Sequence, residues 1–175
     1  MTDSVKFRPA VAADIETIVA LVESAYRGDA SRAGWTTEAD FLDGQRTDAE
    51  GVRPLIESEG SIVLVAERSN ELLACIHVQR LAGAGYFGMF SVRPTLQGQG
   101  IGDLLLRAAE AIVRDQWHLP EMTMTVISIR PELIAYYERR GYRRTGETKP
   151  FPYGDARFGE PKRDDLQFEV FSKRL

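Results

Sequence analysis

The sequence predicts an α/β layered domain built around a mixed sheet. Three observations support this prediction: a meander of three strand-like segments between positions 61 and 92, a glycine-rich turn that leads into an amphipathic helix, and a further strand after that helix. Strand, helix and strand in this order form a βαβ unit, whose two parallel strands are able to splay apart. A chain of 175 residues suits one domain over 1–175 and is long enough to bury a core.

The first elements are a short strand, Val5 to Arg8, and a helix behind Asp14, a candidate N-cap. The helix is predicted from apolar residues at helical spacing: Ile15, Ile18, Val19 and Val22. From Arg27 to Arg53 the chain is rich in Gly, Asp, Ser and Thr, which indicates short helical pieces in an irregular excursion. Such segments often shape a substrate site.

The meander consists of three predicted strands. Ser61 to Glu67 and Leu72 to Leu81 are rich in β-branched and aliphatic residues and are joined across Ser69, Asn70 and Glu71, which predicts an antiparallel hairpin. The third strand, Tyr86 to Val92, follows Gly83 and Gly85 and ends before Pro94.

The second half of the chain alternates helices and strands. The helix after Gly100 has one apolar stripe and ends near Trp117, with the stripe formed by Ile101, Leu104, Leu105, Ala108 and Ile112. The strand Met122 to Ile127 follows, and then Pro131 and Gly141 bracket a short helix. A further strand begins at Tyr142, and the last strand spans roughly Gln167 to Lys173. A polar loop separates the two strands.

Composition excludes several classes of protein. Apolar residues at 43% and charged residues at 27% match an ordinary globular chain, and a net charge of -4 argues against wholesale binding of nucleic-acid phosphates. Cys75 is the single cysteine, so it forms no internal disulfide and provides no metal-site spacing. No apolar stretch approaches membrane-spanning length. We therefore expect a cytoplasmic protein without metal, membrane or nucleic-acid partner.

The segment 97–102 has the chemistry of a phosphate cradle. It lies between a strand end and a helix start, where unsatisfied amide N–H groups and the positive end of the helix attract an anion. Glycines at 98, 100 and 102 allow positive φ or close approach of a ligand. A dinucleotide fingerprint would need G-x-G-x-x-G in an early βαβ unit, and a P-loop would end in Gly-Lys-Ser/Thr, so neither matches. A plain tight turn remains the alternative.

Two motifs in order resemble the GCN5-related N-acetyltransferases. Val92-Arg93-Pro94 followed by Gln97-Gly98-Gln99-Gly100-Ile101-Gly102 is similar to the strand end and Q/R-x-x-G-x-G/A signature of that family. Tyr136-Tyr137-Glu138-Arg139-Arg140-Gly141-Tyr142 is similar to the family helix that ends in Tyr, three residues, Gly and an aromatic residue. The resemblance covers roughly Val5 to Glu147.

The resemblance implies a mostly antiparallel mixed sheet of about six to seven strands, helices on both faces, and acetyl-CoA between splayed parallel strands. By the same resemblance, the main chain of Phe90, Ser91 and Val92 pairs with the pantetheine amides. The pyrophosphate then lies on the loop that comprises Gln97, Gly98, Gln99, Gly100, Ile101 and Gly102. Tyr137 matches the family tyrosine near the thioester sulfur, although Leu133, Ile134 and Tyr137 also form a helical stripe that could close the core.

The reaction implied is attack of an amine on the thioester carbonyl. A lysine-like amine with a pKa of about 10.4 is neutral about once in 2,500 at pH 7, which costs about 4.6 kcal/mol, whereas an α-amine near 7.8 costs about 1 kcal/mol. Tyr137 is expected to donate a hydrogen bond to the departing sulfur, and amides near Phe90 to Val92 to polarise the carbonyl.

The sequence departs from the family pattern at two places. The strand Tyr86 to Ser91 contains no carboxylate to act as a base; candidates by residue type are Glu23, Glu38, Asp40, His77 and Asp155, with a water chain as the alternative. Arg130 stands where the family often has Asn. Trp35 and Phe158, in the two irregular segments, are candidates for walls of an amine pocket.

These observations favour an N-acetyltransferase that transfers acetyl from acetyl-CoA to a primary amine of a small molecule or peptide, acting as a monomer or homodimer. A catalytically silent acyl-CoA sensor is the alternative that the missing carboxylate suggests. A plain nucleotide-binding protein is the third hypothesis.

Overall fold

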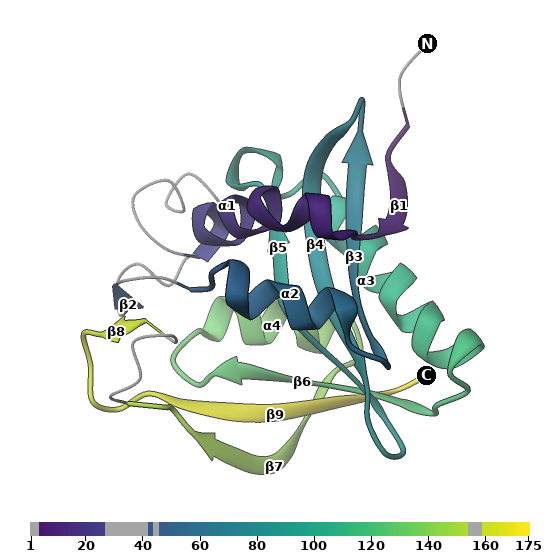
Figure 1. Cartoon of the computed structure of the whole chain (residues 1–175). Coiled ribbons are helices and arrows are strands. Elements are labelled where there is room, and N and C mark those ends of the chain that lie inside the picture. Colours follow the sequence, from purple (N-terminus) through teal and green to yellow (C-terminus); the bar gives the residue numbers. More distant parts are fainter. Residues whose placement is uncertain (1–3, 27–41, 44–45, 154–158) are drawn as a thin grey trace.

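The computed structural model describes residues 4–26, 42–43, 46–153 and 159–175, and in these ranges a seven-stranded sheet carries helices on both faces (Figure 1). The strands of this sheet are β1 (Lys6–Pro9), β3 (Ser61–Arg68), β4 (Glu71–Arg80), β5 (Gly85–Val92), β6 (Glu121–Ile127), β7 (Arg143–Pro150) and β9 (Gln167–Arg174). The helices are α1 (Ile15–Tyr26), α2 (Ala49–Glu57), α3 (Ile101–Ala111) and α4 (Pro131–Arg139). Two short strands, β2 (Leu42–Asp43) and β8 (Glu160–Pro161), pair separately.

The predicted meander is confirmed. β1, β3, β4 and β5 are consecutive neighbours and pair antiparallel. The turn between β3 and β4 has positive φ at Ser69 (53°) and Asn70 (63°), the backbone that tight hairpins require. The sheet is thus mixed and mostly antiparallel, as the sequence predicts.

The parallel pair is β5 and β6, and the two strands share a ladder only at its start. Gly85 pairs with Met122 and Tyr86 with Thr123, and no further pairs follow. β6 continues instead beside β9, with which it pairs as far as Ile127 and Phe168 (Figure 1). The predicted splaying of the strands after Tyr86 is therefore present.

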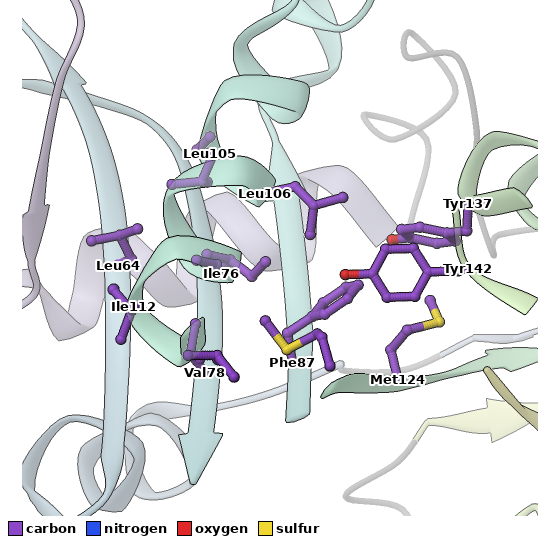
Figure 2. Packing of buried hydrophobic residues seen from close by; sticks show 14 of the residues in the cluster. Leu64, Ile76, Val78, Phe87, Leu105, Leu106, Ile112, Met124, Tyr137 and Tyr142 are labelled. Carbon is purple, nitrogen blue, oxygen red and sulfur yellow. The ribbon is translucent and has the colours of Figure 1, made fainter. Parts of the chain in front are cut away.

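The helices form two layers. In Figure 1, α1 and α2 lie in front of the sheet, whereas α3 and α4 lie behind it. Each layer has a core: one contains Met89 with the apolar face of α1, and the larger contains Phe87 with residues of α3 and α4. Figure 2 shows Phe87 beside Tyr137 and Tyr142, whose rings lie 5.8 and 5.7 Å from it between centroids.

The predicted N-cap of the first helix is wrong. A 3-10 turn, Ala12–Asp14, precedes α1, and its N-cap residue is Val11. Asp14 instead accepts a hydrogen bond from the Val11 N–H at 2.8 Å and forms a salt bridge with Arg8 at 2.8 Å. A carboxylate at the third position of a helical turn bonds back to the N-cap amide, which gives the same local sequence signal as a cap.

Helix α2 is one of the short helical pieces expected between Arg27 and Arg53, and it continues past Arg53 to Glu57. Asp48 is its N-cap and accepts a hydrogen bond from the Gly51 N–H at 2.8 Å. Residues 27–41 and 44–45 lie outside the described part of the chain.

Candidate active site

A β-bulge lies on β5 where it faces the gap left by β6. Cys75 pairs with Ser91 and His77 with Gly88, so β5 advances three residues while β4 advances two. Within the bulge Met89 has a φ of 50°, which is uncommon for a residue other than glycine. The extra residue reverses the alternation of side chains: Met89 packs beneath α1, and Phe90 packs in the α3 and α4 core.

The edge of β5 beyond Tyr86 has no ladder partner on β6. Two side chains bond to this stretch: the Tyr26 hydroxyl donates to the Phe90 carbonyl, and Gln97 Nε2 donates to the Val92 carbonyl at 3.1 Å. A carbonyl oxygen has two lone pairs, so each can accept a further hydrogen bond.

The glycine turn has the backbone that its sequence requires. Gly98 and Gly100 have φ of 82° and 84°, and a Cβ at either would meet no atom within 4 Å, so the space over the turn is open. Gly100 is the N-cap of α3. Gly102 differs, because a Cβ there would lie 3.2 Å from Val92 Cγ2; it allows α3 to pack closely on β5.

A hollow of about 390 Å³, here called the α4 hollow, opens over this turn. It is lined by Phe90, Val92, Leu96, Gln97, Gly98, Gly100, Gly102, Asp103, Leu133, Tyr136, Tyr137 and Arg140. Three residues predicted to bind the cofactor do not line it: Ser91 and Ile101 are buried, and Gln99 is exposed. The buried side chains of Ser91 and Ile101 leave only the main chain of these two residues for contact with a ligand.

Two arginines, Arg93 and Arg107, are close to the glycine turn in sequence. Arg93 is held by Glu71 at 2.7 Å, and Arg107 is 72% exposed and contacts Asp103 at 3.3 Å; neither lines the hollow. Arg140 does, lying 3.4 Å over the Tyr136 ring with its Nε 3.1 Å from Asp103 Oδ1. A cation near the phosphate turn is therefore supplied by the C-cap residue of α4, which is far from the turn in sequence.

Tyr137 lies where the α4 hollow meets a smaller cavity in the gap between β5 and β6. This gap cavity has a volume of about 80 Å³. Burial raises the pKa of Tyr137 well above its ordinary value, with smaller contributions from Tyr26 and Tyr136, so the phenol stays protonated and can donate a hydrogen bond. The side chain is 5% exposed, so it both closes the core and borders the cavity.

A second large hollow, the α2 hollow, lies on the opposite face of the sheet and has a volume of about 480 Å³. It is lined by Arg46, Thr47, Asp48, Glu50, Gly51, Leu55, His77, Tyr86, Gly88 and Met89. Four of these residues also line the gap cavity: Arg46, Tyr86, Gly88 and Met89. The cavity thus lies between two hollows, one on each face.

His77 is the one base candidate that the described part of the chain brings to a hollow. It is 5% exposed, and burial lowers its pKa to about 4, so the ring is neutral at pH 7. Glu23 instead accepts hydrogen bonds from the main chain of Arg46 and Thr47. Glu38, Asp40 and Asp155 lie outside the described residues, as do Trp35 and Phe158, the predicted walls of the amine pocket.

Arg130 is 2% exposed and lines the gap cavity, not the α4 hollow. Its carbonyl begins α4 by accepting from the Leu133 and Ile134 N–H groups at 3.2 and 3.1 Å. The guanidinium is close enough to Tyr137 to favour negative charge there.

Sequence reasoning missed two residues at the gap, Tyr26 and Arg46. Tyr26 continues the i, i+4 stripe of α1 after Val22, so the helical period contained a signal for it. Arg46 stands in a polar segment without periodicity, and no local pattern distinguished it.

Two kinds of feature are absent from the described ranges. No three His, Cys, Asp or Glu side chains gather there as metal ligands. No helix in these ranges combines the length and the apolar character needed to cross a membrane.

The residues that build the meander and the glycine turn match a known class of acetyltransferases. A family model described as "Acetyltransferase (GNAT) domain" matches residues 59–144, which include the meander, the turn, α3 and α4. Residues 59–144 thus match the GNAT family of acetyltransferases, whose acetyl donor is acetyl-CoA.

Individual proteins similar to the chain are enzymes of this class. S-(2-succino)cysteine N-acetyltransferase of Bacillus subtilis (strain 168) is 38% identical over 66 residues, which cover 37% of this chain and 40% of that protein. The match therefore spans less than half of the relative's length.

Solved structures resemble the whole fold at low sequence identity. The ribosomal-protein-S18-alanine N-acetyltransferase of Escherichia coli has a TM-score of 0.72 at 12% identity, covering 98% of this chain and 94% of its own. An acetyltransferase structure from Salmonella typhimurium, solved with its cofactor acetyl-CoA, has a TM-score of 0.71 at 19% identity, covering 99% and 95%.

Proposed function

We propose that the chain transfers an acetyl group from acetyl-CoA to a primary amine, which attacks the thioester directly. The observation that carries this proposal is the arrangement of two hollows on opposite faces of the sheet, with a cavity between them in the β5–β6 gap. A donor held in one hollow and an acceptor held in the other would meet beside Tyr137.

The α4 hollow fits the donor. Gly98 and Gly100 leave open space over amides at the N-terminus of α3, which is where a pyrophosphate binds without displacing a side chain. The main chain of Phe90, Ser91 and Val92 borders the gap and would pair with the pantetheine amides. Arg140 adds positive charge on the other wall.

Acetyl-CoA, when bound, supplies an activated thioester carbonyl. The protein would then stabilise the charge that develops on the oxygen, and main-chain N–H groups of the bulge on β5 would act as fixed dipoles for this. Tyr137, protonated because of burial, would donate a hydrogen bond to the departing sulfur. Arg130 would stabilise negative charge at the same point.

The acceptor is proposed to be a small-molecule or peptide amine. The relative in Bacillus subtilis is named for a cysteine derivative, which makes S-(2-succino)cysteine one compound to include in an acceptor panel. A single domain over 1–175, a monomeric or homodimeric state and a cytoplasmic location complete the proposal.

Thiol release tests the proposal. The protein is incubated with acetyl-CoA and a panel of amines, and free thiol is measured with a thiol reagent while acetyl-CoA binding is measured by calorimetry. We expect thiol release that depends on both the amine and the protein. Tight binding without release for any amine would instead identify the silent sensor, the alternative favoured by the absence of a carboxylate on β5.

A further inference from the structure

The α2 hollow contains a histidine whose ring orientation and tautomer are fixed by two hydrogen bonds. The Ser61 hydroxyl has one hydrogen, which it donates to the Leu55 carbonyl at 2.7 Å. Ser61 Oγ must therefore accept in its contact with His77 Nε2 at 2.8 Å, so Nε2 carries the ring hydrogen. In the neutral ring the lone pair is then on Nδ1, which has no hydrogen-bond partner among the described residues.

Arg46 supplies a cation to the same hollow. Its guanidinium lies 5.2 Å from the centroid of the Tyr26 ring, and Tyr26 is itself anchored to the Phe90 carbonyl. It forms no ion pair with a carboxylate in the described part of the chain, and the Glu23 carboxylate accepts from the main-chain N–H groups of Arg46 and Thr47. A half-buried guanidinium of this kind is suited to a carboxylate, which it can bind through two N–H groups.

The carboxylates and the cations near the α2 hollow lie in different places. Asp48 and Glu50, the carboxylates that line the α2 hollow, belong to the start of α2, and Asp48 caps that helix. The described wall of the gap cavity carries two cations, Arg46 and Arg130, and no carboxylate. The lining of the gap cavity is thus more positive than the lining of the α2 hollow, which favours an acceptor that carries a negative group.

We propose that the α2 hollow selects an acceptor with a carboxylate close to its primary amine, as in an α-amino acid, with Arg46 binding the carboxylate and His77 Nδ1 accepting a hydrogen bond from the amine. This inference rests on the proposed acetyltransferase function and adds the substrate class. His77 orients the amine and does not remove its proton, since a ring with a pKa of about 4 is a weak base.

The test compares α-amino acids with their own C-terminal amides, which keep the amine and lose the carboxylate. Thiol release from acetyl-CoA is measured with both series. We expect kcat/KM to be about 30-fold or more higher for the acids, the usual advantage of a charge-assisted contact. Arg46→Gln should remove this preference by slowing the acids only. Arg53→Gln, which removes the same charge from an exposed residue paired with Glu57, is the control and should keep the preference.

Two variants separate the hydrogen bonds of His77. His77→Gln places an amide near the position of Nε2 and can still reach Ser61, but has no acceptor at the position of Nδ1. His77→Asn places an amide oxygen near Nδ1 and gives up Ser61. We expect His77→Gln to lower kcat about tenfold for the acids, and His77→Asn to recover part of that loss.

The outcomes distinguish the inference from the function on which it rests. Amides acetylated as well as acids, or equal slowing of both by Arg46→Gln, would overturn the substrate class and leave the acetyltransferase intact. Loss of kcat in His77→Asn as great as in His77→Gln would assign His77 a structural role. Bound acetyl-CoA with no thiol release for any acceptor would reject the function itself.

Discussion

Two buried tyrosines with adjacent rings have different hydroxyl environments. The rings of Tyr137 and Tyr142 lie 6.0 Å apart between centroids. Tyr142 donates to Glu110 Oε2 at 2.8 Å, an atom that Lys173 Nζ also approaches at 2.9 Å, whereas Tyr137 borders the α4 hollow and the gap cavity. Removal of the hydroxyl group at each position should therefore have different effects: on stability at Tyr142 and on catalysis at Tyr137.

Tyr142→Phe should lower the free energy of unfolding by about 2 kcal/mol, because it removes a buried hydrogen bond to a carboxylate, and should leave kcat unchanged. Tyr137→Phe should lower kcat by about 100-fold with an unchanged dissociation constant for acetyl-CoA. Denaturant unfolding, thiol release and calorimetry measure these quantities. If Tyr137→Phe weakened acetyl-CoA binding as much as it slowed turnover, the residue would be structural.

His77 makes stability depend on pH. Burial lowers its folded-state pKa from 6.5 to about 4, so its contribution is fully present above pH 6.5 and is lost as the pH falls toward 4, where the unfolded chain binds a proton that the folded protein does not. The shift corresponds to about 3 kcal/mol. Unfolding in urea between pH 7 and 4 should show this loss, and His77→Gln should flatten it. A slope unchanged by the substitution would locate the titrating group elsewhere.

At the scale of elements, the helix after the glycine turn packs on β5 without space for a side chain. A Cβ at Gly85 would lie 2.5 Å from Val113 Cγ2. Val113 is fully buried in the π-helical turn Ile112–Gln116 that continues α3, and a β-branched side chain has few rotamers with which to move aside. Gly85 begins β5 and pairs with Met122, so this contact also fixes where the parallel ladder starts.

Gly85→Ala should therefore lower the free energy of unfolding by about 1–3 kcal/mol through overpacking. Val113→Ala alone should cost about 2 kcal/mol by leaving a cavity. The double substitution should cost less than the sum by at least about 1 kcal/mol, because the new methyl group fills that cavity. A double-mutant cycle in denaturant measures the coupling, and strict additivity would contradict the close packing.

The sequence predicted the elements whose signals are local. The hairpin at Ser69 and Asn70, the glycine turn and the helix from Pro131 are set by residues at fixed offsets, and the structure has all three. The placement of β9 between β6 and β7 is a long-range pairing, which no period of two or 3.6 encodes. Short helical pieces were expected in this segment, but the bounds of α2 were not predicted because Gly51 and Pro54, both weak helix formers, lie within the helix.

Some residues of the candidate site also have a local sequence signal, and others do not. Gly98 and Gly100 could be recognised because positive φ restricts the residue type. The bulge at Met89 could not, since a single extra residue leaves the composition of a strand unchanged. Arg46 and Arg140 reach their hollows only through tertiary packing, so their types and sequence neighbours carried no signal.

For the molecule as a whole, the α4 hollow couples ligand binding to folding. It is lined by residues of β5, α3 and α4, so a ligand that spans it binds only the folded chain. Acetyl-CoA at about 100 times its dissociation constant should add about 2.7 kcal/mol, which raises Tm by about 5–10 °C for a chain of this size.

Gly100→Glu should abolish this rise by placing a carboxylate among the phosphates. Gly146→Glu is the matched control: its φ of 88° and open surroundings resemble those of Gly100, but it lies on β7, away from the hollow. Both should lose a similar amount of intrinsic stability, and only Gly100→Glu should lose the response to acetyl-CoA in a thermal-shift measurement. A preserved response in Gly100→Glu would move the phosphate site away from the turn.

The position of β9 has a consequence for synthesis on the ribosome. β9 pairs with β6 and with β7, although it follows both in the chain, and β6 has only two ladder pairs with β5. While β1 to β5 can assemble as they emerge, β6 and β7 have no strand between them until 167–174 are translated. A nascent chain halted before Gln167 would contain the glycine turn but lack β9, the strand with which both β6 and β7 pair. The side of the β5–β6 gap that β6 forms is therefore completed only when this last strand of the sheet has been made.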